Sequence, residues 1–291
     1  MNKAIRSVLF VIAVMSVSPV GAQVPDLSDV SIVTTAISDG VYMLEATGDV
    51  AGNIAVSVGE DGILIVDDQF EGLSGQILDA LKGLHSGPLR FILNTHHHDD
   101  HSDGNAALIA ATGATVIAHD QARARLMHKK AAHWPTVTYA EGTTIHFNGE
   151  AIQALAVPGG HTDNDSIVIF TNSNTVHMGD LFNSGRSSFP YVDFPAGGNA
   201  IRMLENLERI LPLVPADARI IAGHGPLSDR DGLVDVREML NHTINFVRTR
   251  RARGESLDAI KAEGLPAQYD EWNHGYTSAS DWIKSIYRSL D

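Results

Sequence analysis

Histidine and aspartate side chains are concentrated in one short stretch of the sequence, from Asn94 to Gly104. Within it lies the spacing H-x-H-x-D-H, made of His96, His98, Asp100 and His101. The apolar run Phe91–Leu93 comes directly before and the helix-like run Ala106–Ala111 directly after, so the pattern predicts a tight loop between a strand and a helix. Imidazole and carboxylate groups are the ligands that a catalytic zinc ion prefers, which makes this loop a candidate metal site.

The loop contains more nitrogen and oxygen donors than one tetrahedral ion can use while it keeps a water molecule. Two ions that share the loop are therefore expected, and further ligands must come from later in the chain. Three short apolar runs end in a histidine or an aspartate beside glycine, a residue that lets two backbones approach closely. These runs deliver His161, Asp180 and His224.

The ordered series of motifs resembles the metallo-β-lactamase superfamily, over roughly Ile32 to the C-terminus. The resemblance implies a first zinc site made of His96, His98 and His161. It implies a second zinc site made of Asp100, His101 and His224, with Asp180 as the bridge between the two ions. It also implies that Asp67, at the end of a predicted strand, lies behind the metal loop and orients a ligand without binding metal.

Three neutral imidazoles would leave the first ion strongly Lewis acidic, so that its bound water ionises near pH ~7. We therefore predict that a metal-bound hydroxide attacks the carbonyl of a small amide or ester substrate, with Asp100 as the catalytic proton shuttle. In the loop after Asp180, Arg186 could hold a substrate carboxylate and Tyr191 could hydrogen-bond to the developing oxyanion. A loop salt bridge and a packed aromatic ring are the alternative interpretations of these two residues.

Ring-opening of a β-lactam is the most concrete function that the resemblance suggests. Many true β-lactamases of the superfamily, however, have cysteine or serine where Asp180 stands, and an acidic bridge is similar to lactonases and to thioesterases of the glyoxalase II kind. A lactonase or thioesterase that uses the same site is therefore the alternative. From another class, the same ligands could hold iron in a redox or metal-binding protein.

The N-terminal residues predict an exported protein, and the acidic composition is consistent with the small-molecule substrate that we expect. Residues 1–22 combine Lys3 and Arg6, an apolar run too short to span a membrane comfortably, and a small-residue cleavage site, so they predict a signal peptide and a periplasmic or secreted protein. Its removal would take the formal charge from −14 to −16, which argues against a nucleic-acid partner. The chain of 291 residues has no cysteine, so disulfides are excluded. No later segment is expected to contact a membrane.

The remaining sequence predicts an α/β fold in a single domain, residues 23–291. Two groups of short strands, before and after the region 121–130, are each accompanied by helical patterns. They fit an αββα sandwich of two mixed sheets flanked by helices, which is also the fold that the resemblance implies. We expect a long helix capped by Ser228 and running through Val247, followed by basic residues Arg248–Arg253 that complement the helix dipole.

Overall fold

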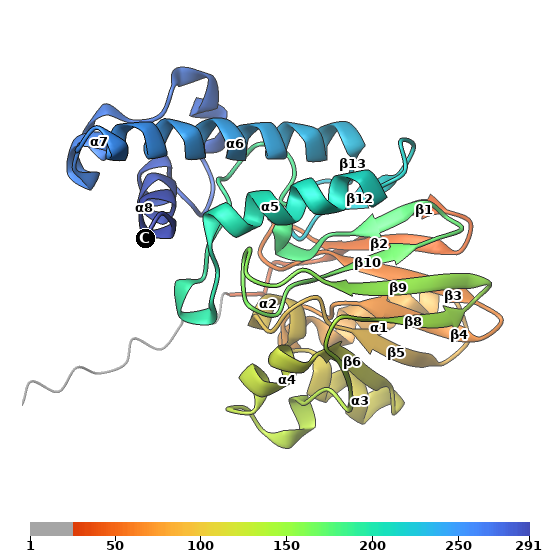
Figure 1. Cartoon of the computed structure of the whole chain (residues 1–291). Coiled ribbons are helices and arrows are strands. Elements are labelled where there is room, and N and C mark those ends of the chain that lie inside the picture. Colours follow the sequence, from red (N-terminus) through yellow and green to blue (C-terminus); the bar gives the residue numbers. More distant parts are fainter. Residues whose placement is uncertain (1–25) are drawn as a thin grey trace, which may run out of the picture.

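The computed structural model describes residues 26–291 as two β-sheets packed face to face, with helices on both outer sides (Figure 1). The predicted αββα sandwich is therefore confirmed. The predicted signal peptide, residues 1–22, lies outside the described residues. Among the residues described, no helix combines the length and the apolar character needed to cross a membrane.

The first sheet has seven strands in the order of the sequence. They are β1 (Ile32–Ser38), β2 (Val41–Ala46), β3 (Ile54–Gly59), β4 (Gly62–Val66), β5 (Leu89–Leu93), β6 (Thr115–His119) and β7 (Val137–Tyr139). The strands from β1 to β4 form an antiparallel meander, whereas β4 to β7 are parallel. The sheet is mixed because helices connect its parallel strands.

The second sheet has six strands. They are β8 (Gly142–Phe147), β9 (Glu150–Ala156), β10 (Ser166–Phe170), β11 (Thr175–His177), β12 (Arg219–Ile221) and β13 (Ser228–Asp229). Only β11 and β12 are parallel, with His177 opposite Ile221. The loops that carry Asp180 and His224 therefore leave the same edge of this sheet, side by side.

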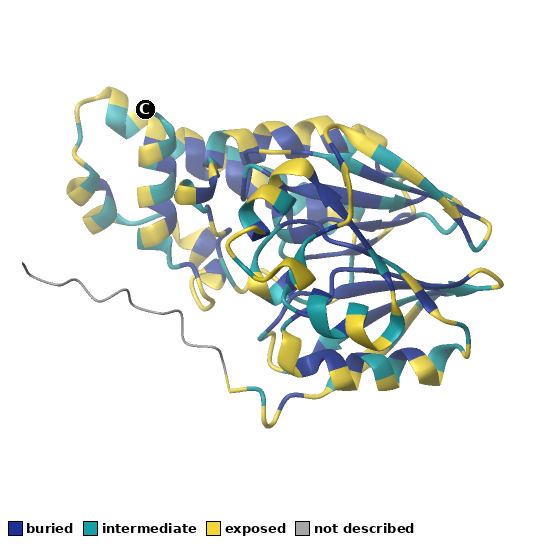
Figure 2. Ribbon diagram, turned by 90° about the horizontal axis from the view of Figure 1, so that it is seen from below, coloured by how far each residue is buried: buried dark blue, intermediate teal, exposed yellow. Residues whose placement is uncertain are grey.

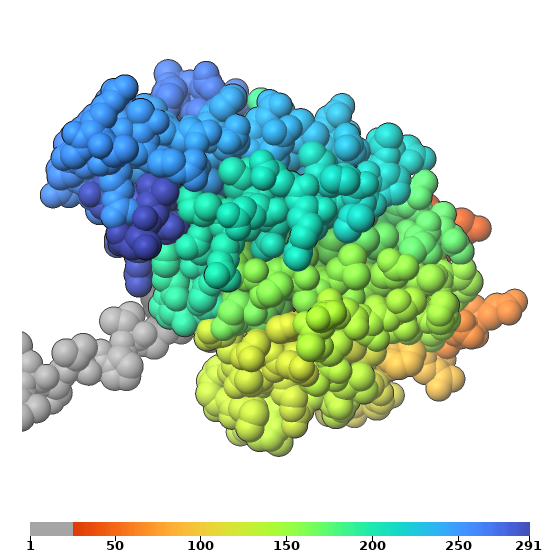
Figure 3. Space-filling model, viewed as in Figure 1, coloured from red at the N-terminus to blue at the C-terminus, as the bar shows by residue number. Residues whose placement is uncertain are grey.

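Eight α-helices complete the described fold, together with six short 3-10 turns that include residues 179–181 and 194–196. The helices are α1 (Ser74–Leu84), α2 (Asp99–Ser102), α3 (Asn105–Thr112), α4 (Asp120–Leu126), α5 (Ala200–Ile210), α6 (Arg230–Ala252), α7 (Leu257–Glu263) and α8 (Ala279–Ser289). Helices α1, α3 and α4 cover the first sheet, and α5 and α6 cover the second (Figure 1). The C-terminal residues, blue in Figure 3, gather at one end of the molecule.

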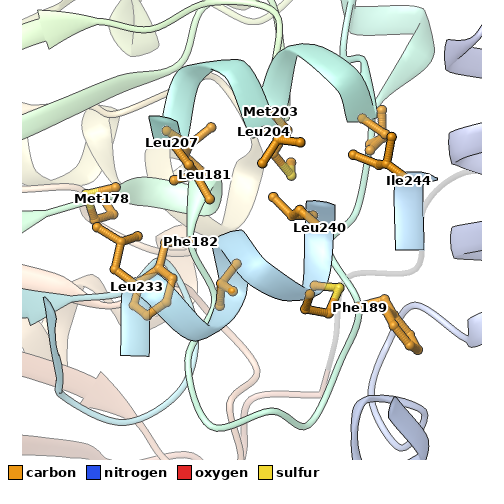
Figure 4. Packing of buried hydrophobic residues seen from close by; sticks show 14 of the residues in the cluster. Met178, Leu181, Phe182, Phe189, Met203, Leu204, Leu207, Leu233, Leu240 and Ile244 are labelled. Atoms are coloured by element: carbon orange, nitrogen blue, oxygen red, sulfur yellow. The ribbon is translucent and has the colours of Figure 1, made fainter. Parts of the chain in front are cut away.

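Three apolar clusters hold these layers together. One lies between the sheets and includes Leu64 and Leu93 from the first sheet and Val168 from the second. The second cluster joins the first sheet to α1 and α3. The third joins the second sheet to α5, α6 and α8, and Figure 4 shows leucines of α5 and α6 pointing toward one another. Strands are accordingly buried, whereas the outer helix faces are exposed (Figure 2).

The start of α6 differs from the prediction. Asp229, not Ser228, caps the helix, because its side chain accepts a hydrogen bond from the Gly232 amide at 3.0 Å. Ser228 instead pairs with Ile220 in the second sheet. The helix also extends to Ala252, so that the basic residues are part of its last turns. Arg250 pairs there with Glu263, which agrees with a structural role for these arginines.

Candidate metal centre

Three of the predicted histidine ligands meet at one point. His96 and His98 lie on the loop after β5, and His161 follows β9. The Nε2 of His161 is 2.9 Å from the Nδ1 of His98 and 3.3 Å from the Nε2 of His96. The Nε2 of His96 is in turn 3.1 Å from the Nδ1 of His98. Three ring nitrogens thus face a common centre.

The other four predicted residues form an adjacent cluster that mixes carboxylates and imidazoles. The Asp100 carboxylate is 3.2 Å from the Nε2 of His224 and 3.7 Å from the Nε2 of His101. Asp180 lies between the two clusters: its Oδ1 is 3.1 Å from His101, and its Oδ2 is 3.5 Å from His161. The structure therefore brings all seven predicted residues together, from four separate loops.

Bound metal would explain the arrangement of these residues better than hydrogen bonds among their side chains do. A tetrahedral zinc with Zn–N bonds of about 2.0–2.1 Å holds its nitrogen ligands roughly 3.3 Å apart, close to the spacing of the three histidines. The Nε2 of His101 and the Oδ1 of Asp180 are both buried and lie 3.1 Å apart, yet neither makes a hydrogen bond. Buried polar atoms without a hydrogen bond are costly, so these two atoms point to a shared ligand. The geometry fits a pair of metal ions.

Two members of the three-histidine cluster, His96 and His161, favour the neutral imidazole. Burial and the neighbouring histidines hold the pKa of His96 well below its usual range. Burial also lowers the pKa of His161 to about 4, although Asp180 opposes the shift. A neutral imidazole has a lone pair free for a metal, so at pH ~7 His96 and His161 can bind an ion without first losing protons.

The mixed cluster has the opposite electrostatics. Burial opposes the charged form of His101, but the carboxylates of Asp180 and Asp100 outweigh burial and raise its pKa well above the usual range. The same carboxylates, against the effect of burial, raise the pKa of His224 to about 10. Without metal, both rings therefore carry protons at pH ~7 and are ion-paired with the aspartates.

Asp67 contacts the metal loop from behind, as the sequence predicted. Its Oδ2 accepts a hydrogen bond from the Nδ1 of His101 at 2.8 Å, and its carboxylate also accepts from the amide and hydroxyl of Thr95, each at 2.7 Å. Asp67 is fully buried and has a positive φ of 65°. These contacts orient the His101 ring so that its Nε2 faces Asp180.

Two further carboxylates that sequence reasoning missed contact the outer nitrogens of predicted ligands. Asp193 accepts from the Nε2 of His98 at 2.9 Å, and Asp49 lies 3.4 Å from the Nδ1 of His224. A ligand histidine usually has a hydrogen-bond partner on its outer nitrogen, but the sequence does not indicate which residue supplies it. The Nδ1 of His161 donates instead to the backbone carbonyl of Tyr191 at 2.9 Å.

Two glycines make room for the mixed cluster. A Cβ atom on Gly52 would lie 2.2 Å from the Cε1 of His101, and one on Gly223 would lie 2.1 Å from the Oδ1 of Asp180. Neither side chain can move away cheaply, because Asp67 fixes His101 and Asp180 stands between the two clusters. Backbone therefore approaches the site where no side chain could fit.

A cavity of about 580 Å³ opens over the two clusters. Tyr191 lines it, with its ring centre 5.8 Å from that of His161, so a contact between Tyr191 and substrate remains a prediction. Arg186 does not line the cavity, and its side chain is 52% exposed and paired with Asp235. This is the loop salt bridge that we gave as the alternative, and the placement does not support carboxylate binding by Arg186.

Comparison with known proteins agrees with this geometry. The family model described as the metallo-beta-lactamase superfamily matches residues 38–224, which include all seven predicted ligands. The chain belongs to this superfamily. Among solved structures, this superfamily member is similar to a metallo-beta-lactamase from Pontibacter korlensis (TM-score 0.64, 19% identity, 72% of this chain and 99% of that chain). It is also similar to the DIM-1 metallo-beta-lactamase (TM-score 0.62, 16% identity, 74% and 99%).

Curated relatives of this superfamily member have a different activity from the one that we predicted first. The chain is 29% identical over 199 residues to a hydroxyacylglutathione hydrolase of Nitrosococcus oceani, which covers 67% of this chain and 65% of the relative. A hydroxyacylglutathione hydrolase of Methylococcus capsulatus is also 29% identical, over 66% of this chain and 67% of the relative. The prediction that the chain is a hydrolase is confirmed, but the prediction of β-lactam ring-opening is wrong. The alternative, a thioesterase, agrees better with these relatives.

Proposed function

We propose that this chain is a zinc-dependent thioester hydrolase with a two-metal site. The observation that carries the proposal is the Asp180 carboxylate, which directs one oxygen to each cluster. The names of the curated relatives support thioester hydrolysis, because the bond broken in an acylated glutathione is a thioester. The solved metallo-β-lactamase structure is only 19% identical in sequence, so its similarity to this chain shows a shared fold and not a shared activity.

In this proposal His96, His98 and His161 would hold one ion, Asp100, His101 and His224 the other, and Asp180 both. Bound zinc supplies Lewis acidity, which polarises a carbonyl group and lowers the pKa of water. Asp67, Asp193 and Asp49 keep the histidine rings in the orientation that binding requires. The Asp100 side chain is 27% exposed and lines the cavity, so its carboxylate can accept a proton from the attacking water.

The test begins with purified residues 23–291 and a measurement of their metal content. A lactoyl thioester of N-acetylcysteamine is the substrate, and released thiol is detected with a thiol reagent. The chain has no cysteine, so the protein gives no background in this assay. We expect two zinc ions per chain, loss of turnover after chelation, and recovery with zinc.

Magnesium is the matched control, because it prefers oxygen ligands and should not restore turnover at a histidine-rich site. Turnover that survives complete removal of metal would contradict the proposal. Iron in the purified protein, with redox activity and no thioesterase activity, would favour the redox alternative.

Export is part of the proposal as well. It rests on the sequence of residues 1–22, with Lys3 and Arg6 before an apolar run. N-terminal sequencing of the protein recovered from the periplasm or medium of expressing cells tests it, and we expect a new N-terminus near residue 23. A chain that keeps Met1 and stays in the cytosol would contradict export.

A further inference from the structure

Two tyrosines at the mouth of the cavity form an aromatic pair. Tyr191 and Tyr276 both line the cavity, and their ring centres are 5.6 Å apart at an interplanar angle of 83°. Tyr276 is 85% exposed, and Tyr191 is 40% exposed. An exposed aromatic side chain beside a metal centre presents apolar surface that a ligand can cover.

The loop that carries Tyr276 is fixed against the loop that carries Tyr191. Ser188 and Asn273 form a β-bridge, and the amide of Thr277 donates to the Ser188 hydroxyl at 3.0 Å. The His274 amide donates to the Ser187 carbonyl at 3.1 Å. The exposure of Tyr276 is therefore a property of a well-bonded wall of the cavity and does not reflect a frayed segment.

This wall of the cavity includes residues that lie outside the region matched by the family model. The match ends at residue 224, whereas Gly275, Tyr276 and Thr277 come from the segment before α8. Metal ligands determine which bond is broken, but the mouth of a cavity determines which substrates reach it. The tyrosine pair is thus placed to select substrates.

The rest of the cavity lining includes several acidic residues. Asp99 and Asp103 both line it and share a single cation, Lys129, whose Nζ is 2.6 Å from Asp99 and 2.7 Å from Asp103. Asp49, 48% exposed, adds another carboxylate. Among the described residues that line the cavity there is no lysine or arginine. A negatively charged group that extends beyond the metal centre would therefore meet like charge.

We propose that this site selects thioesters that carry an uncharged aryl or other apolar group, which packs against Tyr276 and Tyr191. The inference rests on the proposed thioesterase function and narrows its substrate class. Glutathione, with two carboxylates, is a poor fit to a cavity lining that has several aspartates and no lysine or arginine among the described residues. The curated relatives named for glutathione substrates would then share the reaction of this chain but not its preferred substrate.

A neighbouring cavity supplies the strongest competing interpretation. It lies across the tyrosine pair, shares Tyr191 and Tyr276 with the main cavity, and is lined by Lys284 and Arg288. The guanidinium of Arg288 stacks 4.2 Å from the ring centre of Phe194, and Asp281 lies in the same lining. If a substrate carboxylate reached Lys284, glutathione thioesters would be favoured. The experiment therefore includes a glutathione thioester and a Lys284 variant.

The experiment compares lactoyl thioesters of benzyl mercaptan, N-acetylcysteamine and glutathione, which share one acyl group and have similar alkyl thiol leaving groups. The 3-phenylpropanoyl and butanoyl thioesters of N-acetylcysteamine provide the reciprocal test on the acyl side. The zinc-loaded wild type is compared with Tyr276→Ala, Tyr276→Phe, Lys284→Ala and Leu213→Ala. Leu213 is an exposed apolar residue outside the cavity, which makes it the matched control.

We expect kcat/KM to be highest for an aryl-bearing thioester and lowest for the glutathione thioester. Tyr276→Ala should lower kcat/KM about tenfold for at least one aryl substrate, mainly through KM, and less than about twofold for the lactoyl and butanoyl N-acetylcysteamine thioesters, because only the aryl group loses a stacking partner. Tyr276→Phe keeps the ring and should therefore retain the preference for aryl substrates, and Leu213→Ala should behave like the wild type.

Two results would overturn the inference. One is an equal effect, or no effect, of Tyr276→Ala on all substrates; the other is a preference for the glutathione thioester that Lys284→Ala abolishes. A thioether analogue of the benzyl substrate, titrated by calorimetry, separates this inference from the proposed function. Weaker binding to Tyr276→Ala supports the aryl site even if no thioester is hydrolysed, whereas unchanged binding contradicts it.

Discussion

The two halves of the metal-ligand cluster are neighbours but differ in charge. Three histidines of one half are held by a carbonyl, a hydroxyl and the carboxylate of Asp193, and burial keeps His96 and His161 neutral. In the other half, the carboxylates around His101 and His224 favour protonated rings in the absence of metal. In the first half, His96 and His161 therefore offer lone pairs to a metal ion. In the second half, His101 and His224 are ion-paired with aspartates.

A set of candidate ligands predicted together can therefore differ in electrostatic environment from one residue to the next. An ion in the three-histidine half would have Asp180 as its one carboxylate neighbour, so little of its charge would be offset and it would be the stronger Lewis acid. An ion in the mixed half would displace protons, and both Asp100 and Asp180 would offset its charge. Asp180 couples the two halves, so a change there should have the largest effect.

Replacement of Asp180 by asparagine should remove this coupling. The amide keeps the shape of the side chain but not its charge, so each of the two proposed ions would lose an anionic ligand. We expect turnover to fall by about 10³-fold, which corresponds to roughly 4 kcal/mol of transition-state stabilisation. Thioesterase assays together with metal analysis measure the effect. A variant that keeps two ions and full activity would show that the halves are independent.

Each half can also be weakened separately through the carboxylate behind it. Asp193→Asn should affect the ion of the three-histidine half, and Asp67→Asn the ion of the mixed half, each with a loss of about 10–100-fold in metal affinity. Asparagine tolerates the positive φ of Asp67. Stepwise metal titration shows which ion is lost.

Asp163→Asn is the matched control for this pair, because Asp163 bonds to Arg125 and not to a ligand histidine. Its metal affinity should equal that of the wild type. If Asp193→Asn and Asp67→Asn weakened the same ion, the division into two halves would be wrong.

Proton release should distinguish the halves at pH ~7. Binding to the three-histidine half should release almost no protons from His96 and His161, whereas binding to the mixed half should release about two, one each from His101 and His224. Calorimetric titrations in buffers of different ionisation enthalpy measure these numbers. Equal release by both ions would contradict the electrostatic contrast.

The same contrast gives a pH dependence for the metal-free protein. The folded-state pKa of His224, about 10, lies above that of an unfolded histidine, so its ion pairs stabilise the fold fully below pH ~6.5. This stabilisation is lost as the pH rises through about 10. Thermal unfolding of metal-free protein from pH 6 to 10 should show a falling Tm, and a rising Tm would refute the assignment.

The smallest effect is expected outside both halves. Arg186→Ala removes an exposed ion pair with Asp235, and such pairs contribute about 0–1 kcal/mol. Turnover of neutral and anionic thioesters should change less than twofold relative to each other. A selective loss for anionic substrates would restore the carboxylate-binding role that the sequence suggested.

The candidate ligands could be predicted from the sequence because their chemistry is local. Few residue types bind zinc, and the loop from His96 to His101 places four of them together whatever the rest of the chain does. Asp180 and His224 could be added because each follows a short apolar strand. The alternation of strands and helices likewise limited the fold to a few α/β arrangements.

Other features depend on tertiary contacts that leave no local pattern. Asp193 lies in an irregular stretch, and only the fold brings it to His98. The partner of Arg186 is on α6, far away in the sequence. Ser228 and Asp229 are both good helix caps, and pairing of Ser228 with Ile220 decides between them. Tyr276 reaches the cavity through a loop that has no periodicity to predict it.

The close approach of Gly52 and Gly223 to the mixed cluster has a consequence for mutagenesis. At these positions selection would act on the absence of a side chain, because even a methyl group would occupy the space of His101 or Asp180. A saturation library screened for activity should therefore recover glycine at both positions. Two residues without a functional group would then be as intolerant of substitution as the side chains that they make room for.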